Sequence, residues 1–72
     1  MDNKPFLTVM IPVYNGAEYV AEAIRSALDQ PCRDLEVLVL DDGSKDDTLT
    51  ICQRLAEEDS RVHVVTHANV GL

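Results

Sequence analysis

Cysteine and basic residues are scarce in this sequence, and long apolar runs are missing from it. The two cysteines, Cys32 and Cys52, are too few and too far apart for a zinc-binding pattern or a dense disulfide framework. Six Lys and Arg stand against thirteen Asp and Glu, and the net charge of -7 argues against nonspecific binding to nucleic acid or anionic lipid. We therefore expect no nucleic-acid partner, and a nucleotide diphosphate would need a divalent cation to offset the charge.

Membrane and export signals are also missing from the sequence. The longest apolar run, residues 9–14, contains Pro12 and falls far short of the roughly 20 residues that cross a bilayer. The opening Met-Asp-Asn-Lys-Pro lacks the charged-then-apolar layout of a signal peptide. These features predict a cytoplasmic location, with any attachment to the inner face of the membrane made through regions outside this sequence.

What the sequence does contain is typical of a globular α/β chain. Its 72 residues allow one domain, with 46% hydrophobic and 26% charged residues. Apolar runs rich in β-branched residues predict strands over residues 6–13, 35–40 and 61–65, and Pro12 is expected to end the pairing of the first. The two segments between the strands have helical periodicity.

The two predicted helices span residues 15–29 and 44 to about 58. Each has an apolar stripe at helical spacing, formed by Val20, Ala23, Ile24, Ala27 and Leu28 in the first and by Ile51, Cys52, Leu55 and Ala56 in the second. Asn15 with Glu18, and Ser44 with Asp47, have the spacing of capping pairs at the two helix starts. Three acids in succession, residues 57–59, oppose the helix dipole and predict the end of the second helix.

The order β-α-β-α-β predicts an incomplete Rossmann-like unit with parallel strands in the spatial order 3-2-1. Two crossovers in the same direction place both helices on one face of the sheet. The strands are nevertheless apolar on both faces, which predicts that residues 1–72 are the N-terminal part of a larger domain. Residues 67–72 are expected to form a loop leading to another helix. An alternative hypothesis is a noncatalytic fragment that self-associates through the uncovered face.

Candidate chemistry lies where the first two strands end, because ligands bind at the carboxyl ends of strands in open α/β sheets. Tyr14 follows the first strand, and Asp41 and Asp42 follow the second. A tyrosine ring stacks on a base, and a carboxylate accepts the imide N–H of uracil or ribose hydroxyl protons. A purely structural interpretation, in which these acids cap a helix, stays open. A metal site is disfavoured, because adjacent residues at a strand end point to opposite faces.

Three motifs together resemble family 2 glycosyltransferases in order and spacing: Ile-Pro-Val-Tyr-Asn-Gly at residues 11–16, Asp-Asp-Gly-Ser-Lys-Asp at 41–46 and Asn-Val-Gly at 69–71. The resemblance implies the N-terminal part of a GT-A fold and inverting transfer of a sugar from a nucleotide sugar, often a UDP-sugar, with Mg²⁺ or Mn²⁺. By similarity Pro12 and Tyr14 line the base pocket, Asp42 binds the base, and Asp41 shapes the turn or assists at the ribose. Glu18 is a lesser candidate at the rim.

The resemblance also identifies what these 72 residues lack. The Asp-x-Asp that holds the metal and the diphosphate is not present, and neither is the acidic base that deprotonates the acceptor. The acceptor, a glycan or glycolipid, would contact other regions. We therefore expect no catalytic residue and no metal ligand in this chain, and no catalysis by the chain alone.

Other polar residues are weaker candidates. His63 and His67 have no ligand-spaced partner, and Cys52 falls on an apolar helix face, so structural roles are expected for all three. Lys45, beside the acidic turn, is the one basic residue worth testing. A dinucleotide-binding unit needs a Gly-x-Gly-x-x-Gly turn after the first strand, and a receiver domain needs an acidic pair there. The sequence has neither.

Overall fold

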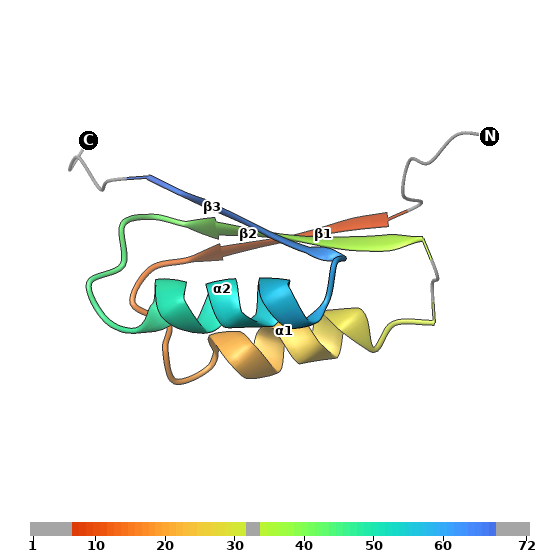
Figure 1. The fold of residues 1–72 in the computed structure, drawn as a ribbon, viewed down its shortest axis with the longest axis horizontal. Coiled ribbons are helices and arrows are strands. Elements are labelled where there is room, and N and C mark those ends of the chain that lie inside the picture. Colours follow the sequence, from red (N-terminus) through yellow and green to blue (C-terminus); the bar gives the residue numbers. More distant parts are fainter. Residues whose placement is uncertain (1–6, 32–33, 68–72) are drawn as a thin grey trace.

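The computed structural model describes residues 7–31 and 34–67. Its elements are β1 (Leu7–Val13), α1 (Val20–Leu28), β2 (Leu35–Asp41), α2 (Thr48–Glu58) and β3 (Val62–Thr66). The strands form one parallel sheet with β2 in the middle, flanked by β1 and β3 (Figure 1). The predicted α/β class and strand order are confirmed. Phe6, Cys32 and the predicted loop after His67 lie outside the described residues.

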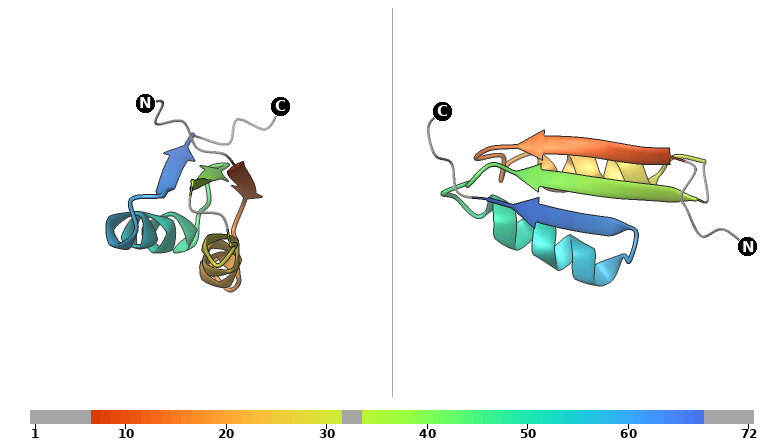
Figure 2. Two further views of the ribbon diagram at one scale, coloured as in Figure 1. Left: turned by 90° about the vertical axis from the view of Figure 1, so that its right-hand side faces the viewer. Right: turned by 90° about the horizontal axis from the view of Figure 1, so that it is seen from above.

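Both helices pack on the same face of the sheet, as expected for two crossovers in one direction (Figure 2). The central strand shows the consequence: its residues alternate between fully buried on the helix side and half-buried on the other side. The core between the layers is apolar, and its buried members are Val13, Val20, Ile24, Ala27, Val37, Val39, Cys52, Leu55 and Val62. Both predicted apolar stripes therefore face the sheet.

Cys52 is part of this core. Burial, with a smaller contribution from the negative charge of Asp41, raises the pKa of its thiol to about 11. The thiol is therefore protonated at neutral pH, when it is a poor nucleophile and fills space as a small apolar group. This agrees with the structural role expected from its position on α2.

The second face of the sheet carries apolar side chains that no described helix covers. The parallel register aligns Met10 with Leu38 and aligns Pro12 with Leu40 and Val65. Met10 is 58% exposed and Val65 is 50% exposed. We call these five residues the uncovered face. The helices within residues 7–31 and 34–67 are α1 and α2, and neither is long and apolar enough to cross a membrane.

Both helices begin later than predicted, and the expected capping pairs are wrong. α1 begins at Val20 and α2 at Thr48, and neither start has a side-chain cap. Asn15 has a left-handed backbone, with φ 52°, which no helix admits. Gly16 instead closes a turn, its carbonyl accepting from the amide of Val20 at 2.8 Å. The end of α2 at Glu58 is as predicted.

Pro12 does not end the pairing of β1, which continues to Val13. The reason lies in the alternation of an edge strand, where successive residues direct their N–H and C=O groups to opposite sides. The carbonyl of Val13 faces β2, since it accepts from the amide of Asp42 at 3.0 Å. The nitrogen of Pro12 therefore points away from β2, where no ladder hydrogen bond is lost.

Candidate nucleotide-binding site at the strand ends

The three strands end at the same edge of the sheet, where the arrowheads of Figure 2 lie together. A shallow, open depression of about 480 Å³ lies at this edge, and we call it the strand-end pocket. Its lining residues come from all three strand ends and are Pro12, Val13, Tyr14, Leu40, Asp42 and His67. Three segments that are far apart along the chain thus contribute to one surface.

The pleat of the sheet explains which side chains reach the pocket. Val13, Asp41 and Thr66 are aligned across the strands and belong to the row that faces the helices. The residue after each of them lies on the opposite side, because successive side chains alternate. Tyr14 and Asp42 therefore meet on the uncovered side of the sheet, whereas Asp41 turns away from them.

Tyr14 and Asp42 supply the recognition chemistry of the strand-end pocket. Tyr14 is 45% exposed, so part of its ring is open to a ligand. The carboxylate of Asp42 is about half exposed, and its Oδ1 lies 3.4 Å from Nε2 of His67. An aromatic ring beside an accessible carboxylate suits a flat ligand that carries N–H donors.

Asp41 is buried, with 1% of its surface exposed. It accepts a hydrogen bond from the Thr66 hydroxyl at 2.8 Å, and its two carboxylate oxygens lie 3.4 Å from the amide of Ser44. The next glycine, Gly43, has the left-handed φ of 69° that glycine adopts at little cost. Of the two roles expected for Asp41, the structure supports shaping the turn, since so buried a side chain does not reach a ligand in the pocket.

Glu18 is exposed on the turn that precedes α1 and does not line the strand-end pocket. Its expected place at the rim of the site stays a prediction. Lys45 contacts the neighbouring loop through its backbone: its amide donates to Asn15 Oδ1 at 2.8 Å. The side chain of Lys45 is not a lining residue either.

The loops that follow β1 and β2 are joined to each other by hydrogen bonds. The amide of Asn15 donates to Ser44 Oγ at 2.9 Å, and the Asn15 side chain accepts from the amide of Lys45. The side chains expected to cap their own helices, Asn15 and Ser44, therefore bind the opposite loop. We call the hydrogen bonds between residues 15–17 and 44–48 the loop clasp.

A second part of the loop clasp is centred on Thr48, which is fully buried. Its hydroxyl accepts from the amide of Gly16 at 2.8 Å and donates to the carboxylate of Asp46, which also accepts from the amide of Ala17 at 3.2 Å. The Thr48 hydroxyl, with the Thr48 and Ala17 amides, stabilises the charged carboxylate and holds the pKa of Asp46 below its usual value. The clasp is therefore intact at neutral pH.

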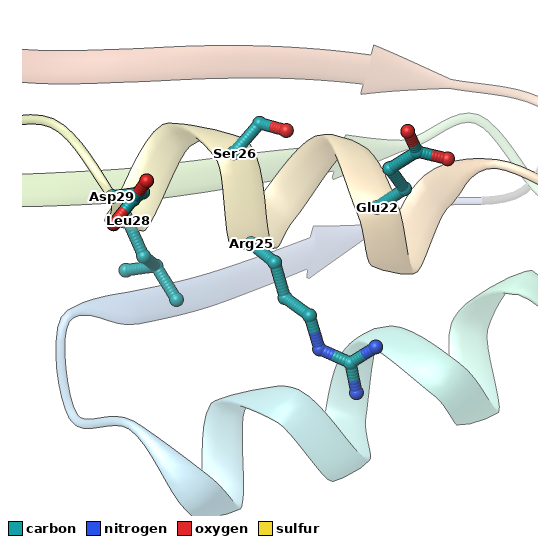
Figure 3. A pocket seen from close by; sticks show the side chains of 5 residues that line it. All are labelled: Glu22, Arg25, Ser26, Leu28 and Asp29. Atoms are coloured by element: carbon teal, nitrogen blue, oxygen red, sulfur yellow. The ribbon is translucent and has the colours of Figure 1, made fainter.

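Another depression lies along α1, lined by Glu22, Arg25, Ser26, Leu28 and Asp29 (Figure 3). In Figure 3 Arg25 extends in the direction of α2, while Glu22 and Ser26 point elsewhere. Consecutive turns of one helix line this depression, so it lacks the convergence of separate elements that the strand-end pocket has. We assign it no ligand.

Residues 7–31 and 34–67 contain no group of three His, Cys, Asp or Glu side chains that are placed to hold a metal ion. The adjacent acids at the strand end illustrate why, since Asp41 is buried on the helix side and Asp42 lies at the pocket. The divergence expected from strand geometry is confirmed.

His67 was missed as a pocket residue. It follows the third strand, and its amide donates to the carbonyl of Asp41 at 3.2 Å. The signal that identified Tyr14 and Asp42 applies to it equally, because a residue just beyond a parallel strand lies at the same edge of the sheet. The spacing of metal ligands along the sequence, in contrast, gives no information about that position.

Known proteins are similar to this chain in sequence. Residues 8–72 match the family model described as "Glycosyl transferase family 2". The chain is 41% identical over 68 residues to a chondroitin synthase of Escherichia coli and 38% identical over 72 residues to a hyaluronan synthase of Pasteurella multocida. These alignments cover 94% and 100% of the chain, but only 10% and 7% of the relatives.

A solved structure shares the fold. A mannosyltransferase of Pyrobaculum calidifontis, in complex with GDP-Man and Mn²⁺, superposes with a TM-score of 0.74 at 29% identity. The match covers 93% of this chain and 20% of that one. The predicted fold class, a Rossmann-like unit from the N-terminal part of a GT-A fold, is confirmed. With the family model matched from residue 8 to residue 72, this chain belongs to glycosyl transferase family 2.

Proposed function

We propose that residues 1–72 form the nucleotide-binding part of a glycosyltransferase that transfers a sugar from a nucleotide sugar to an acceptor hydroxyl. The observation that supports this most directly is the convergence of Pro12, Tyr14 and Asp42 on the strand-end pocket. These side chains come from two strands and offer a flat apolar surface, an aromatic ring and an accessible carboxylate. That combination fits a nucleobase.

The base that suits this pocket is one with a ring N–H. A carboxylate accepts the N3–H of uracil, or the N1–H and exocyclic N–H of guanine, whereas adenine and cytosine present an unprotonated ring nitrogen at the corresponding edge. We propose a UDP-sugar as the donor, by the family resemblance. Guanine is the competing base, since the mannosyltransferase of Pyrobaculum calidifontis was solved with GDP-Man.

The remaining steps belong to regions beyond the described residues. We propose that transfer inverts the anomeric carbon, that Mg²⁺ or Mn²⁺ binds the diphosphate, and that an acidic base deprotonates a glycan or glycolipid hydroxyl. The net charge of -7 repels a dianionic ligand, and a bound cation would offset that repulsion. The cytoplasmic location expected from the sequence stays a prediction.

Asp42→Asn is expected to weaken UDP binding about tenfold, because it replaces a charged carboxylate acceptor with a neutral amide oxygen, which forms a weaker hydrogen bond with the N–H donor of the base. The measurement is a titration of the ¹⁵N-labelled chain with UDP in the presence of Mn²⁺, followed by amide chemical shifts. GDP and ADP are titrated in parallel, with UDP stronger than GDP and ADP weakest. Tyr14→Phe, which keeps the ring, should retain binding.

The control is Glu22→Gln, which removes a carboxylate of the same charge from the outer side of α1 and should leave the UDP affinity unchanged. Equal UDP affinity in wild type and Asp42→Asn would exclude Asp42 from base recognition. Shifts confined to residues away from Tyr14, Asp42 and His67 would place the nucleotide elsewhere. A clear preference for GDP would replace uracil with guanine.

A second candidate role, self-association, is favoured by the uncovered face. Its apolar side chains include Met10 and Val65, each at least half exposed. A surface of this kind marks a protein contact. Sedimentation velocity over a concentration series is expected to show reversible dimers, which the double substitution Met10→Lys and Val65→Lys abolishes by placing charge in the contact. A monomer at every concentration would contradict this role.

A further inference from the structure

The loop clasp lies beside the strand-end pocket without lining it. We propose that Ser44 and Thr48 are positioning residues, which hold the Tyr14 side of the pocket at a set distance from the Asp42 side. The proposal rests on the proposed function, since it assigns these residues a role in binding a nucleobase. They act through the backbone and do not touch the ligand.

Hydrogen bonds bracket Tyr14 on both sides. The carbonyl of Val13, the preceding residue, accepts from the amide of Asp42 at 3.0 Å. The amide of Asn15, the following residue, donates to Ser44 Oγ at 2.9 Å. The backbone that carries the aromatic ring is therefore tied, before and after Tyr14, to the loop that carries the carboxylate.

The buried part of the clasp extends this connection into the fold. Thr48, the first residue of α2, accepts from the amide of Gly16 through its hydroxyl. Because Thr48 is fully buried and Gly16 is also buried, solvent does not compete for this bond. The loop after β1 is thereby anchored to the start of a helix that packs on the sheet.

Packing does not supply the same constraint at the pocket. Tyr14 is 45% exposed, and the pocket is shallow and open, so few side-chain contacts limit the movement of the ring. A binding site gains affinity when its groups are held in place before the ligand arrives, because less freedom is then lost on binding. The hydrogen bonds that the Ser44 and Thr48 hydroxyls accept from the amides of Asn15 and Gly16 are among the described contacts that provide this order.

Binding measurements form the first arm of the test. Ser44→Ala and Thr48→Val each remove a hydroxyl and are expected to weaken UDP binding, in the presence of Mn²⁺, roughly two- to tenfold, a change of the size that one hydrogen bond contributes. Ser44→Thr and Thr48→Ser keep the hydroxyls and should restore wild-type affinity. Ser26→Ala and Thr50→Val, at exposed positions on α1 and α2, are the matched controls and should leave affinity unchanged.

Backbone ¹⁵N relaxation of the ligand-free chain forms the second arm. Order parameters at the amides of Tyr14 and Asp42 are expected to be near 0.85 in wild type and to fall toward about 0.6 in Ser44→Ala and Thr48→Val. Unchanged order parameters at both amides would overturn the proposal. So would loosened loops in Ser44→Ala with undiminished UDP affinity. If wild type binds neither UDP nor GDP, the proposed function fails, and the relaxation arm alone decides whether Ser44 and Thr48 order the pocket.

Discussion

Gly16→Ala is expected to lower the free energy of unfolding by about 2–3 kcal/mol, the cost of forcing a methyl group into a packed site. A Cβ at this position would lie 2.5 Å from Val13 Cγ2 and 2.7 Å from Tyr19 Cζ, closer than carbon atoms approach. A chain of 72 residues has a total stability of roughly 4–11 kcal/mol, so the loss is a large share of it. Thermal unfolding followed by circular dichroism is expected to show a Tm lower by about 10 °C or more.

Relief of the collision is the control for this prediction. Tyr19 is 53% exposed, so Tyr19→Ala alone should cost little, and the double variant Gly16→Ala with Tyr19→Ala should recover part of the lost stability. Recovery should be partial, because Val13 is a core residue and keeps its own contact with the new methyl group. A Gly16→Ala protein as stable as wild type would show that the loop after β1 moves freely, contrary to its hydrogen bond with Thr48.

Asp41→Ala is expected to lower the free energy of unfolding by about 2 kcal/mol. The substitution leaves a cavity between the sheet and α2 and removes the acceptor of the Thr66 hydroxyl and of the Ser44 amide. The turn that carries Asp42 loses its internal support at the same time. Urea unfolding at neutral pH measures the change as a lower midpoint at an unchanged slope.

Asp41→Asn separates the hydrogen bonds from the charge. The amide keeps the size of the side chain and an oxygen that accepts from Thr66, so the expected loss is below about 1 kcal/mol. An exposed acid, Asp47, provides the matched surface control, and Asp47→Ala should leave stability nearly unchanged. If Asp41→Ala were instead more stable than wild type, the cost of burying the carboxylate would exceed the value of its bonds.

The two adjacent acids thus have separate roles. Asp41 is buried and holds the turn, and Asp42 faces the strand-end pocket and is available to a ligand. Stability measurements should respond mainly to Asp41 and nucleotide titrations mainly to Asp42. A single substitution at each position, examined by both methods, distinguishes the two.

The architecture was determined by the sequence alone. Apolar β-branched runs alternating with helical stripes leave few topologies for a short chain, because parallel strands with one-handed crossovers are the arrangement that buries those stripes. The same rules placed Tyr14 and Asp42 at one edge of the sheet. They also showed that adjacent acids would diverge, since the side-chain period of a strand is two.

The helix starts and the partners of the loop residues were decided only by the tertiary structure. Asn15 and Ser44 have the chemistry of capping residues, and a local pattern has no means of showing that the opposite loop lies within hydrogen-bonding distance. Once the sheet brings the loops together, bonds between them replace the local caps. His67 enters the pocket for the same reason: register across the strands, which the sequence does not display, sets which residues meet at the sheet edge.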